Sequence, residues 1–448
     1  MEIKSRTGVS LFLILLVGII CIRSVAYASK GVQDIHDKDK IHSDSLREWW
    51  YFSGFVESKD SNHSFGLMMD IEYEKETAAC NLLFAIFDLR NGTIYDFSQF
   101  DDDPQKIVYQ KEGENFSISY KNCHIVCSYP HYYLHFVDDN GTAEINLTYR
   151  AVSTPHTILE EVINDNPIPL HVYFGSCKYY FILRNNITGK IRLGNKEFMV
   201  GGLGYYEHAW GNWSWSKSFS HFKLSLENLK VYFKIMRWML KEFLLGERIE
   251  GASFRPFPEG NNLHSYDWGT AFLSNGWSIY FAYFPFYFKE GITYGVVYLE
   301  EDEKIYHLFG KIYFNYENLS LVDVRGVSHY FPLNLRVIAC NEKGEKLSFT
   351  FFMRTEKWLR LQELPAPSRW KYIGGIHAKG KVKGFYSGQG ERIQFEGLAE
   401  IGLNRQFGKK DIKNLFPFFL PFHFVSPPKD SINIQILDVF MGSTGNLF

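Results

Sequence analysis

Short segments in which apolar and polar residues alternate most strongly limit what this 448-residue chain can fold into. Residues 116–120 (FSISY) and 392–396 (RIQFE) alternate with a period of two, as a strand with one buried face does. Turn sequences such as Asn91-Gly92 and Ser274-Asn275-Gly276 separate such segments. Phe, Tyr and Trp make up 17% of the chain, which favours strands and supplies apolar surface for a core or a cavity. The pattern predicts an antiparallel β-sandwich or β-barrel.

The N-terminus has the features of a secretory signal peptide. Lys4 and Arg6 precede an apolar run over residues 11–22, and Ala26-Tyr27-Ala28 places small residues where a signal peptidase reads them. The run is shorter than the ~20 apolar residues of a membrane-spanning helix, and a retained anchor is the alternative. We predict that residues 1–28 are removed and that the mature protein is secreted or lies at the cell surface.

Export would permit glycosylation and disulfide formation. Asn-x-Ser/Thr sites occur at Asn62, Asn91, Asn115, Asn140, Asn146, Asn186, Asn212 and Asn318. The cysteines that remain after cleavage are Cys80, Cys123, Cys127, Cys177 and Cys340, and one or two disulfides among them are expected. Cys123, Cys127, His131 and the nearby His124 could instead form a zinc cluster, although buried thiols or half of a disulfide explain them more simply.

Charge and length limit the partners and the number of domains. The chain has 48 basic and 50 acidic residues, so nothing indicates binding to nucleic acid. About 420 residues after cleavage suggest two domains, with three as the alternative, and a boundary is expected near the loop over residues 254–262. Residues 235–245 have one apolar helical face, which predicts a lid or a flap that contacts a membrane surface, or else a helix packed flat on a barrel.

Three Trp-rich clusters each place an acidic residue among aromatic residues. They span residues 48–54, 204–211 and 266–269. A carboxyl group in such surroundings loses hydration, and its pKa rises toward a value that suits proton donation. The alternative is that the aromatic side chains plug the ends of barrels while the acidic side chains point to solvent.

Strand geometry divides these clusters into two faces. If residues 204–211 are extended, His208 and Trp210 share one face and Glu207 lies on the other. Trp268 and Asp267 are opposed in the same way. A single cavity is therefore not expected to receive both Glu207 and His208 without a bulge.

Several segments, in this order, resemble motifs of the carotenoid 1,2-hydratase and AttH-like family, whose members are often labelled secreted hydrolases. They are residues 48–54 (EWWYFSG), 204–211 (GYYEHAWG), 266–284 (YDWGTAFLSNGWSIYFAYF), 329–333 (HYFPL), 372–375 (YIGG) and 390–397 (GERIQFEG). The resemblance covers residues 44 to 400. The chain differs where the hydratases commonly have His-Asp-His, since it has Tyr206-Glu207-His208.

The resemblance implies an all-β protein of two tandem lipocalin-like antiparallel β-barrels with a short helical insertion. The N-terminal barrel is expected over residues 29–255, with the insertion at 212–262, and the C-terminal barrel over 256–405. An extension follows over 406–448. The resemblance implies no cofactor and no metal.

The resemblance also implies an activity. Hydratase members of the family add water across a terminal isoprenoid double bond, and the matching catalytic positions are His208, Trp210, Tyr266 and Asp267. Glu207 is a further candidate acid. The expected ligand is an apolar isoprenoid or lipid, which Trp49, Trp50, Tyr51 and Trp268 would contact. A non-catalytic carrier and a cell-surface binding protein are the alternatives, and serine-hydrolase chemistry is disfavoured because the sequence has no Gly-x-Ser-x-Gly.

Overall fold

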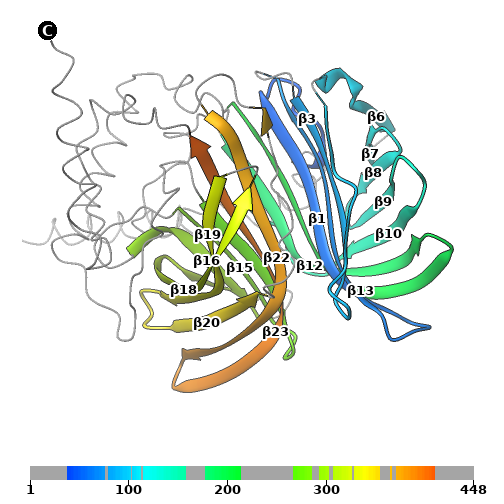
Figure 1. The fold of residues 1–448 in the computed structure, drawn as a ribbon. Coiled ribbons are helices and arrows are strands. Elements are labelled where there is room, and N and C mark those ends of the chain that lie inside the picture. The colour runs from blue at the N-terminus through cyan, green and yellow to red at the C-terminus, as the bar shows by residue number, and fades with distance from the viewer. Residues whose placement is uncertain are drawn as a thin grey trace, which may run out of the picture.

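The computed structural model describes residues 38–75, 79–101, 103–112, 115–157, 177–212, 266–284, 292–301, 306–324, 327–353, 364–365 and 370–408. Apart from short helical turns such as Pro104–Lys106, the elements of these residues are strands. They form two antiparallel sheets, a half-barrel and a nearly closed barrel (Figure 1). The predicted all-β fold is confirmed.

The first sheet curves into the half-barrel. Its strands are β1 (Arg47–Ser58), β2 (Ser64–Glu74), β3 (Ala79–Asp88), β4 (Ile94–Asp96), β5 (Gln99–Asp101), β6 (Val108–Glu112), β7 (Asn115–Tyr120), β8 (Cys123–Ser128), β9 (His131–Val137), β10 (Ala143–Ala151), β11 (His156–Thr157), β12 (Cys177–Leu193) and β13 (Lys196–Gly211). Their order is β4-β3-β2-β1-β13-β12-β10-β9-β8-β7-β6, with β5 beside β3 and β11 beside β12. The N-terminal strand β1 therefore pairs with the distant β13 along its whole length.

The second sheet comes closer to a closed barrel. Its strands are β14 (Tyr266–Leu273), β15 (Ser278–Phe284), β16 (Ile292–Glu300), β17 (Tyr306–Phe309), β18 (Lys311–Val324), β19 (Val327–Cys340), β20 (Lys346–Met353), β21 (Leu364–Pro365), β22 (Trp370–Gly388) and β23 (Glu391–Gly408). Their order is β15-β14-β23-β22-β20-β19-β18-β16-β17, and β21 pairs with β22. A further pairing joins β15, the first strand of this path, to β16, the last strand but one.

The apolar side chains form three clusters. One fills the half-barrel and a second fills the other barrel. The third joins Tyr51 of β1 and Tyr205 of β13 to Trp268, Tyr280 and Tyr298 of the second sheet. Strands such as β2 are therefore buried on both faces, whereas β7 alternates between buried and partly exposed residues. Because burial of each large apolar side chain stabilises the fold by ~1.5–3 kcal/mol, the third cluster gives the two sheets a shared core.

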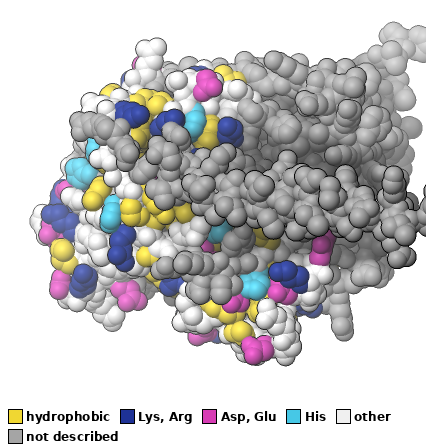
Figure 2. Space-filling model, turned by 180° about the vertical axis from the view of Figure 1, so that it is seen from behind, with side chains coloured by type: hydrophobic (Ala, Val, Ile, Leu, Met, Phe, Trp, Pro, Cys, Tyr) yellow, Lys and Arg dark blue, Asp and Glu magenta, His cyan; other side chains and the backbone are white. Residues whose placement is uncertain are grey.

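The described surface shows no separation of charge by sign on the face drawn in Figure 2. Basic and acidic side chains are interspersed there. Among the described residues, no helix is long and apolar enough to cross a membrane.

The described cysteines are not joined in disulfides. Cys80, Cys123, Cys127 and Cys340 are free thiols, so the expected disulfides do not form among these four. Cys123 and Cys127 lie four residues apart on β8, which separates their Cα atoms by ~13 Å and prevents them from binding one zinc ion together. Residues 1–28, the helix predicted over 235–245, the boundary near residue 255 and the side chain of Cys177 lie outside the described part of the chain.

Candidate functional site

Strand β13 carries candidate functional side chains on both of its faces. His208 stacks on Trp50 with ring centroids 4.6 Å apart, and Trp210 belongs to the core of the half-barrel. Glu207 points the other way, toward the second sheet, where it meets tyrosine side chains. The strand alternation predicted for residues 204–211 is confirmed, and no bulge brings Glu207 and His208 to one side.

Three donors hold the carboxyl group of Glu207 between the two sheets. Trp49 Nε1 lies 2.9 Å from Oε1, and the Tyr205 hydroxyl lies 2.6 Å from Oε2. The Tyr179 hydroxyl also donates to Oε2. Tyr280 of β15 donates in turn to the Tyr179 hydroxyl at 3.2 Å. Both sheets therefore contribute to one hydrogen-bonded network around a carboxyl group that is only 6% exposed.

This environment changes the protonation of Glu207. Burial raises the pKa, and the hydrogen bonds from Tyr179, Tyr205 and Trp49 oppose the rise without cancelling it. The pKa of Glu207 is raised from 4.5 to about 7. A carboxyl group with such a pKa is partly protonated near neutral pH, where it can donate a proton.

Aromatic rings surround this network. Trp268 lies edge-on to Tyr51 at 5.4 Å between centroids and stacks with Tyr205 at 6.2 Å. Tyr205 also stacks with Tyr280 at 5.9 Å. Gly402, which pairs with Trp268 across the sheet, makes room for the indole, because a Cβ there would come within 2.1 Å of Nε1.

A buried ion pair lies in the same layer. Lys379 Nζ lies 2.8 Å from a Glu400 carboxylate oxygen and donates to the Leu67 carbonyl oxygen of the first sheet at 2.9 Å. The Tyr51 hydroxyl donates to the other oxygen of Glu400. Burial alone would raise the pKa of Glu400, but the charge of Lys379 and the nearby His377 lower it to about 2. Burial also lowers the pKa of Lys379, and Glu400 opposes that effect.

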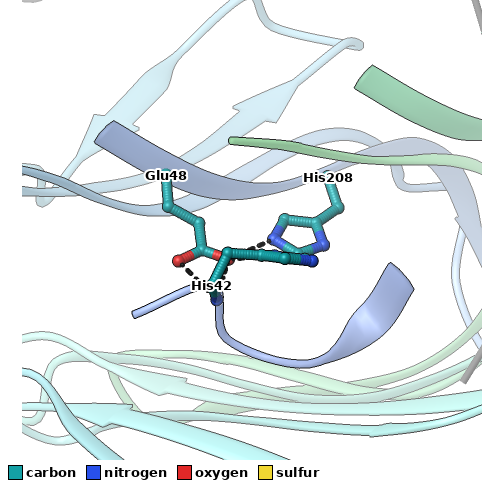
Figure 3. Close-up of side chains that lie close together, drawn as sticks. All are labelled: His42, Glu48 and His208. Carbon is teal, nitrogen blue, oxygen red and sulfur yellow. Dashed lines mark hydrogen bonds and ion pairs between the residues drawn. The ribbon is translucent and has the colours of Figure 1, made fainter. Parts of the chain in front are cut away.

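A separate polar cluster lies inside the half-barrel. Glu48 of β1 contacts His208 of β13 and His42, which precedes β1, and Figure 3 shows the three side chains converging. The Tyr73 hydroxyl donates to Glu48 at 2.6 Å, and Trp210 stacks on His42 with centroids 3.9 Å apart. Burial raises the pKa of Glu48, but its contacts with His208, His42 and Tyr73 lower it to about 2. These three residues are of the types that bind metal ions.

The structure divides the predicted site residues among three places. Glu207, Trp49, Tyr51 and Trp268 meet between the sheets, whereas His208, Trp210 and Trp50 lie in the half-barrel. Asp267 is fully buried in the other barrel, where it accepts a hydrogen bond from Tyr316. Tyr266 begins β14, and its side chain lies outside the described part of the structure. The expected group of His208, Trp210 and Asp267 is therefore not assembled in one place.

Several residues of the site were not predicted from sequence. Tyr179, Lys379 and Glu400 lie outside the quoted motifs, and nothing in their local sequence marks them. Tyr280 lies within residues 266–284, but nothing distinguished it from the other aromatic residues of that segment. Tyr179 reaches Glu207 from the neighbouring strand β12 of the same sheet. Tyr280 contacts Tyr179, and Glu400 contacts Tyr51, because the two sheets pack face to face. His42 had a weak signal, since it lies six residues before Glu48 of the first Trp-rich cluster.

The fold and the site define an all-β protein of two barrel-like sheets with a protonatable carboxyl group between them. No family model matches the sequence, and no curated protein matches it. Among solved structures, the chain is similar to one assigned as AttH from Nitrosomonas europaea, with a TM-score of 0.51, 13% identity, and 81% of this chain and 94% of that chain covered. This likeness supports the predicted lipocalin-like fold.

Two further solved structures show weaker likeness. Kievitone hydratase from Nectria haematococca gives a TM-score of 0.47 at 11% identity, over 81% of this chain and 90% of that chain. CghA, solved with Sch210972, gives 0.48 at 12% identity, over 81% of this chain and 89% of that chain.

Proposed function

We propose that the protein adds water to a carbon–carbon double bond of an apolar, isoprenoid-like molecule, with Glu207 as the proton donor. The observation that carries this proposal is the placement of Glu207. Its carboxyl group is buried between the two sheets, bonded to two tyrosine hydroxyls and an indole N–H, and surrounded by aromatic rings. An acid in such a place can protonate a substrate that has no polar group to be recognised.

The proposed reaction has two steps. The Glu207 carboxylic acid transfers its proton to one carbon of the double bond, and the π electrons form the new C–H bond, which leaves a cation on the other carbon. Water then bonds to the cation, and its surplus proton returns to the Glu207 carboxylate. The net change is the addition of one water molecule, and Glu207 is regenerated.

The aromatic side chains support both binding and the cation. A cation against the face of Trp268 or Tyr205 would be stabilised by up to ~2 kcal/mol where water is excluded. The buried ion pair nearby is internally neutral, since Lys379 balances Glu400. An uncharged substrate therefore suits this layer better than an ionic one.

Incubation with isoprenoid alkenes in isotopically labelled water tests the proposal. We expect one labelled oxygen atom per product molecule, detected by mass spectrometry. The same analysis of apolar molecules that co-purify with the protein would supply the first substrates to try. Retention of such a molecule without any uptake of label, across the series, would instead indicate a carrier and contradict the hydratase.

A further inference from the structure

Three potential metal ligands meet on the opposite face of β13 from Glu207. They are His42 from the segment before β1, Glu48 from β1 and His208 from β13, and their ligand atoms all lie within 4.8 Å of one another (Figure 3). Glu48 Oε1 is central, at 2.9 Å from both His42 Nδ1 and His208 Nε2. Among the described residues, these three form the group of His, Cys, Asp or Glu side chains that lie close enough together to bind one metal ion.

The contacts of His208 fix which of its ring nitrogens carries the hydrogen. The lone pair of the other nitrogen then points at a carboxylate oxygen of Glu48. His208 Nδ1 lies 2.6 Å from the carbonyl oxygen of Lys38, which can only accept, so Nδ1 carries the hydrogen. Nε2 of a neutral ring is then an acceptor, yet it faces the Glu48 carboxylate, which is also an acceptor. A cation between these two atoms removes the conflict.

A metal ion satisfies this arrangement better than a proton does. A proton bridges two atoms at a time, whereas one metal ion can bind His42 Nδ1, Glu48 Oε1 and His208 Nε2 together, since these atoms all lie within 4.8 Å of one another. The contacts behind the ligands are also those of a metal centre, in which a bound histidine donates its other N–H to a backbone carbonyl group and the carboxylate is itself hydrogen-bonded. Lys38 and the Tyr73 hydroxyl fill these two positions.

We propose that His42, Glu48 and His208 bind one divalent metal ion, of which zinc fits the ligands best. Two imidazole nitrogens and one carboxylate form a set that zinc accepts, with a further position left for water. The ion would tie the segment before β1 to β1 and β13. This site is independent of the proposed chemistry at Glu207, which faces away from it.

Zinc titration of the full chain by calorimetry, after chelation and dialysis, tests the site. We expect one zinc ion per wild-type chain and a higher Tm when zinc is added, because an ion that binds only the folded state stabilises it. His42→Ala should weaken zinc binding more than ~100-fold. Removing a group that only hydrogen-bonds to a metal ligand already lowers metal affinity about 10–100-fold, and His42 is itself a proposed ligand. His42 is partly exposed, with a 17% exposed side chain, so this variant is the one most expected to fold.

His135→Ala is the matched control. His135 also pairs with a glutamate, Glu144, at 3.0 Å, but it is 45% exposed, and Arg192 already binds that carboxylate at 2.6 Å. This control should bind zinc like the wild type. Absence of stoichiometric binding by the wild type would overturn the proposal, as would equal zinc affinity in folded His42→Ala and wild-type protein. Should His42→Ala fail to fold, the wild-type stoichiometry and the Tm shift still decide the question.

Discussion

Glu207→Gln is expected to lower kcat for water addition by about 10²–10⁴-fold, the usual contribution of a positioned acid. Glutamine has nearly the same shape, and its carbonyl oxygen can still accept from Tyr205, but its amide N–H groups are far too weakly acidic to protonate a double bond. Substrate affinity should therefore change little, because the lost interaction acts in the transition state. Steady-state kinetics with the alkene identified by labelled water provides the measurement.

Glu197→Gln is the control for this substitution. Glu197 lies on the same strand but is 50% exposed, where it pairs with Lys190 at 3.2 Å. The kcat of the Glu197→Gln variant should match that of the wild type. A Glu207→Gln variant that keeps full turnover would remove Glu207 as the donor, whereas equal losses in both variants would point to a general effect on the strand.

Lys379→Met is expected to destabilise the protein by about 3–5 kcal/mol, the usual effect of leaving one member of a buried ion pair without its partner. Glu400 would remain fully buried with a hydrogen bond from Tyr51 and with His377 Nδ1 3.9 Å away. The hydrogen bond from Lys379 to the Leu67 carbonyl oxygen, which joins the second sheet to the first, would be lost as well. The substitution should therefore weaken the packing of the two sheets against each other. The midpoint of urea denaturation measures the change.

The same pair of strands supplies the control for Lys379→Met. Lys383 pairs with Glu396 across β22 and β23 at 3.1 Å, but both side chains are more than 60% exposed. Because exposed pairs contribute little, Lys383→Met should change stability by less than about 1 kcal/mol. Replacing both buried partners, Lys379→Met with Glu400→Leu, should recover much of the loss. A single Lys379→Met variant as stable as the wild type would show that the pair does not hold the sheets together.

Local alternation was sufficient to predict the fold class but not the relation between the sheets. Residues 115–120 show buried and partly exposed positions in turn, as their sequence indicates. Strand β2 shows no such alternation in burial, since its second face packs in the layer between the sheets. Which strands are buried on both faces depends on how the two sheets pack against each other, and no short segment of sequence encodes that packing.

The site shows the same limit. Alternation correctly separated Glu207 from His208 and Asp267 from Trp268, because side-chain direction along a strand is a local property. The grouping of His208 with Asp267 came from motif order alone, and the structure places them in different barrels. The network of Glu207 could not be predicted, because Tyr179 and Tyr280 reach it from strands of different sheets.

A crystal structure of the Glu207→Gln variant with a bound alkene would test the central claim most directly. The slowed variant should retain the substrate, and the proposal predicts one double-bond carbon about 3–3.5 Å from the side-chain end of residue 207, as a reacting group requires. The chain of the substrate should lie against Trp268 and Tyr205 between the two sheets. A substrate bound instead inside the half-barrel, against His208 and Trp210, would contradict the assignment of Glu207 and of this layer as the site of reaction.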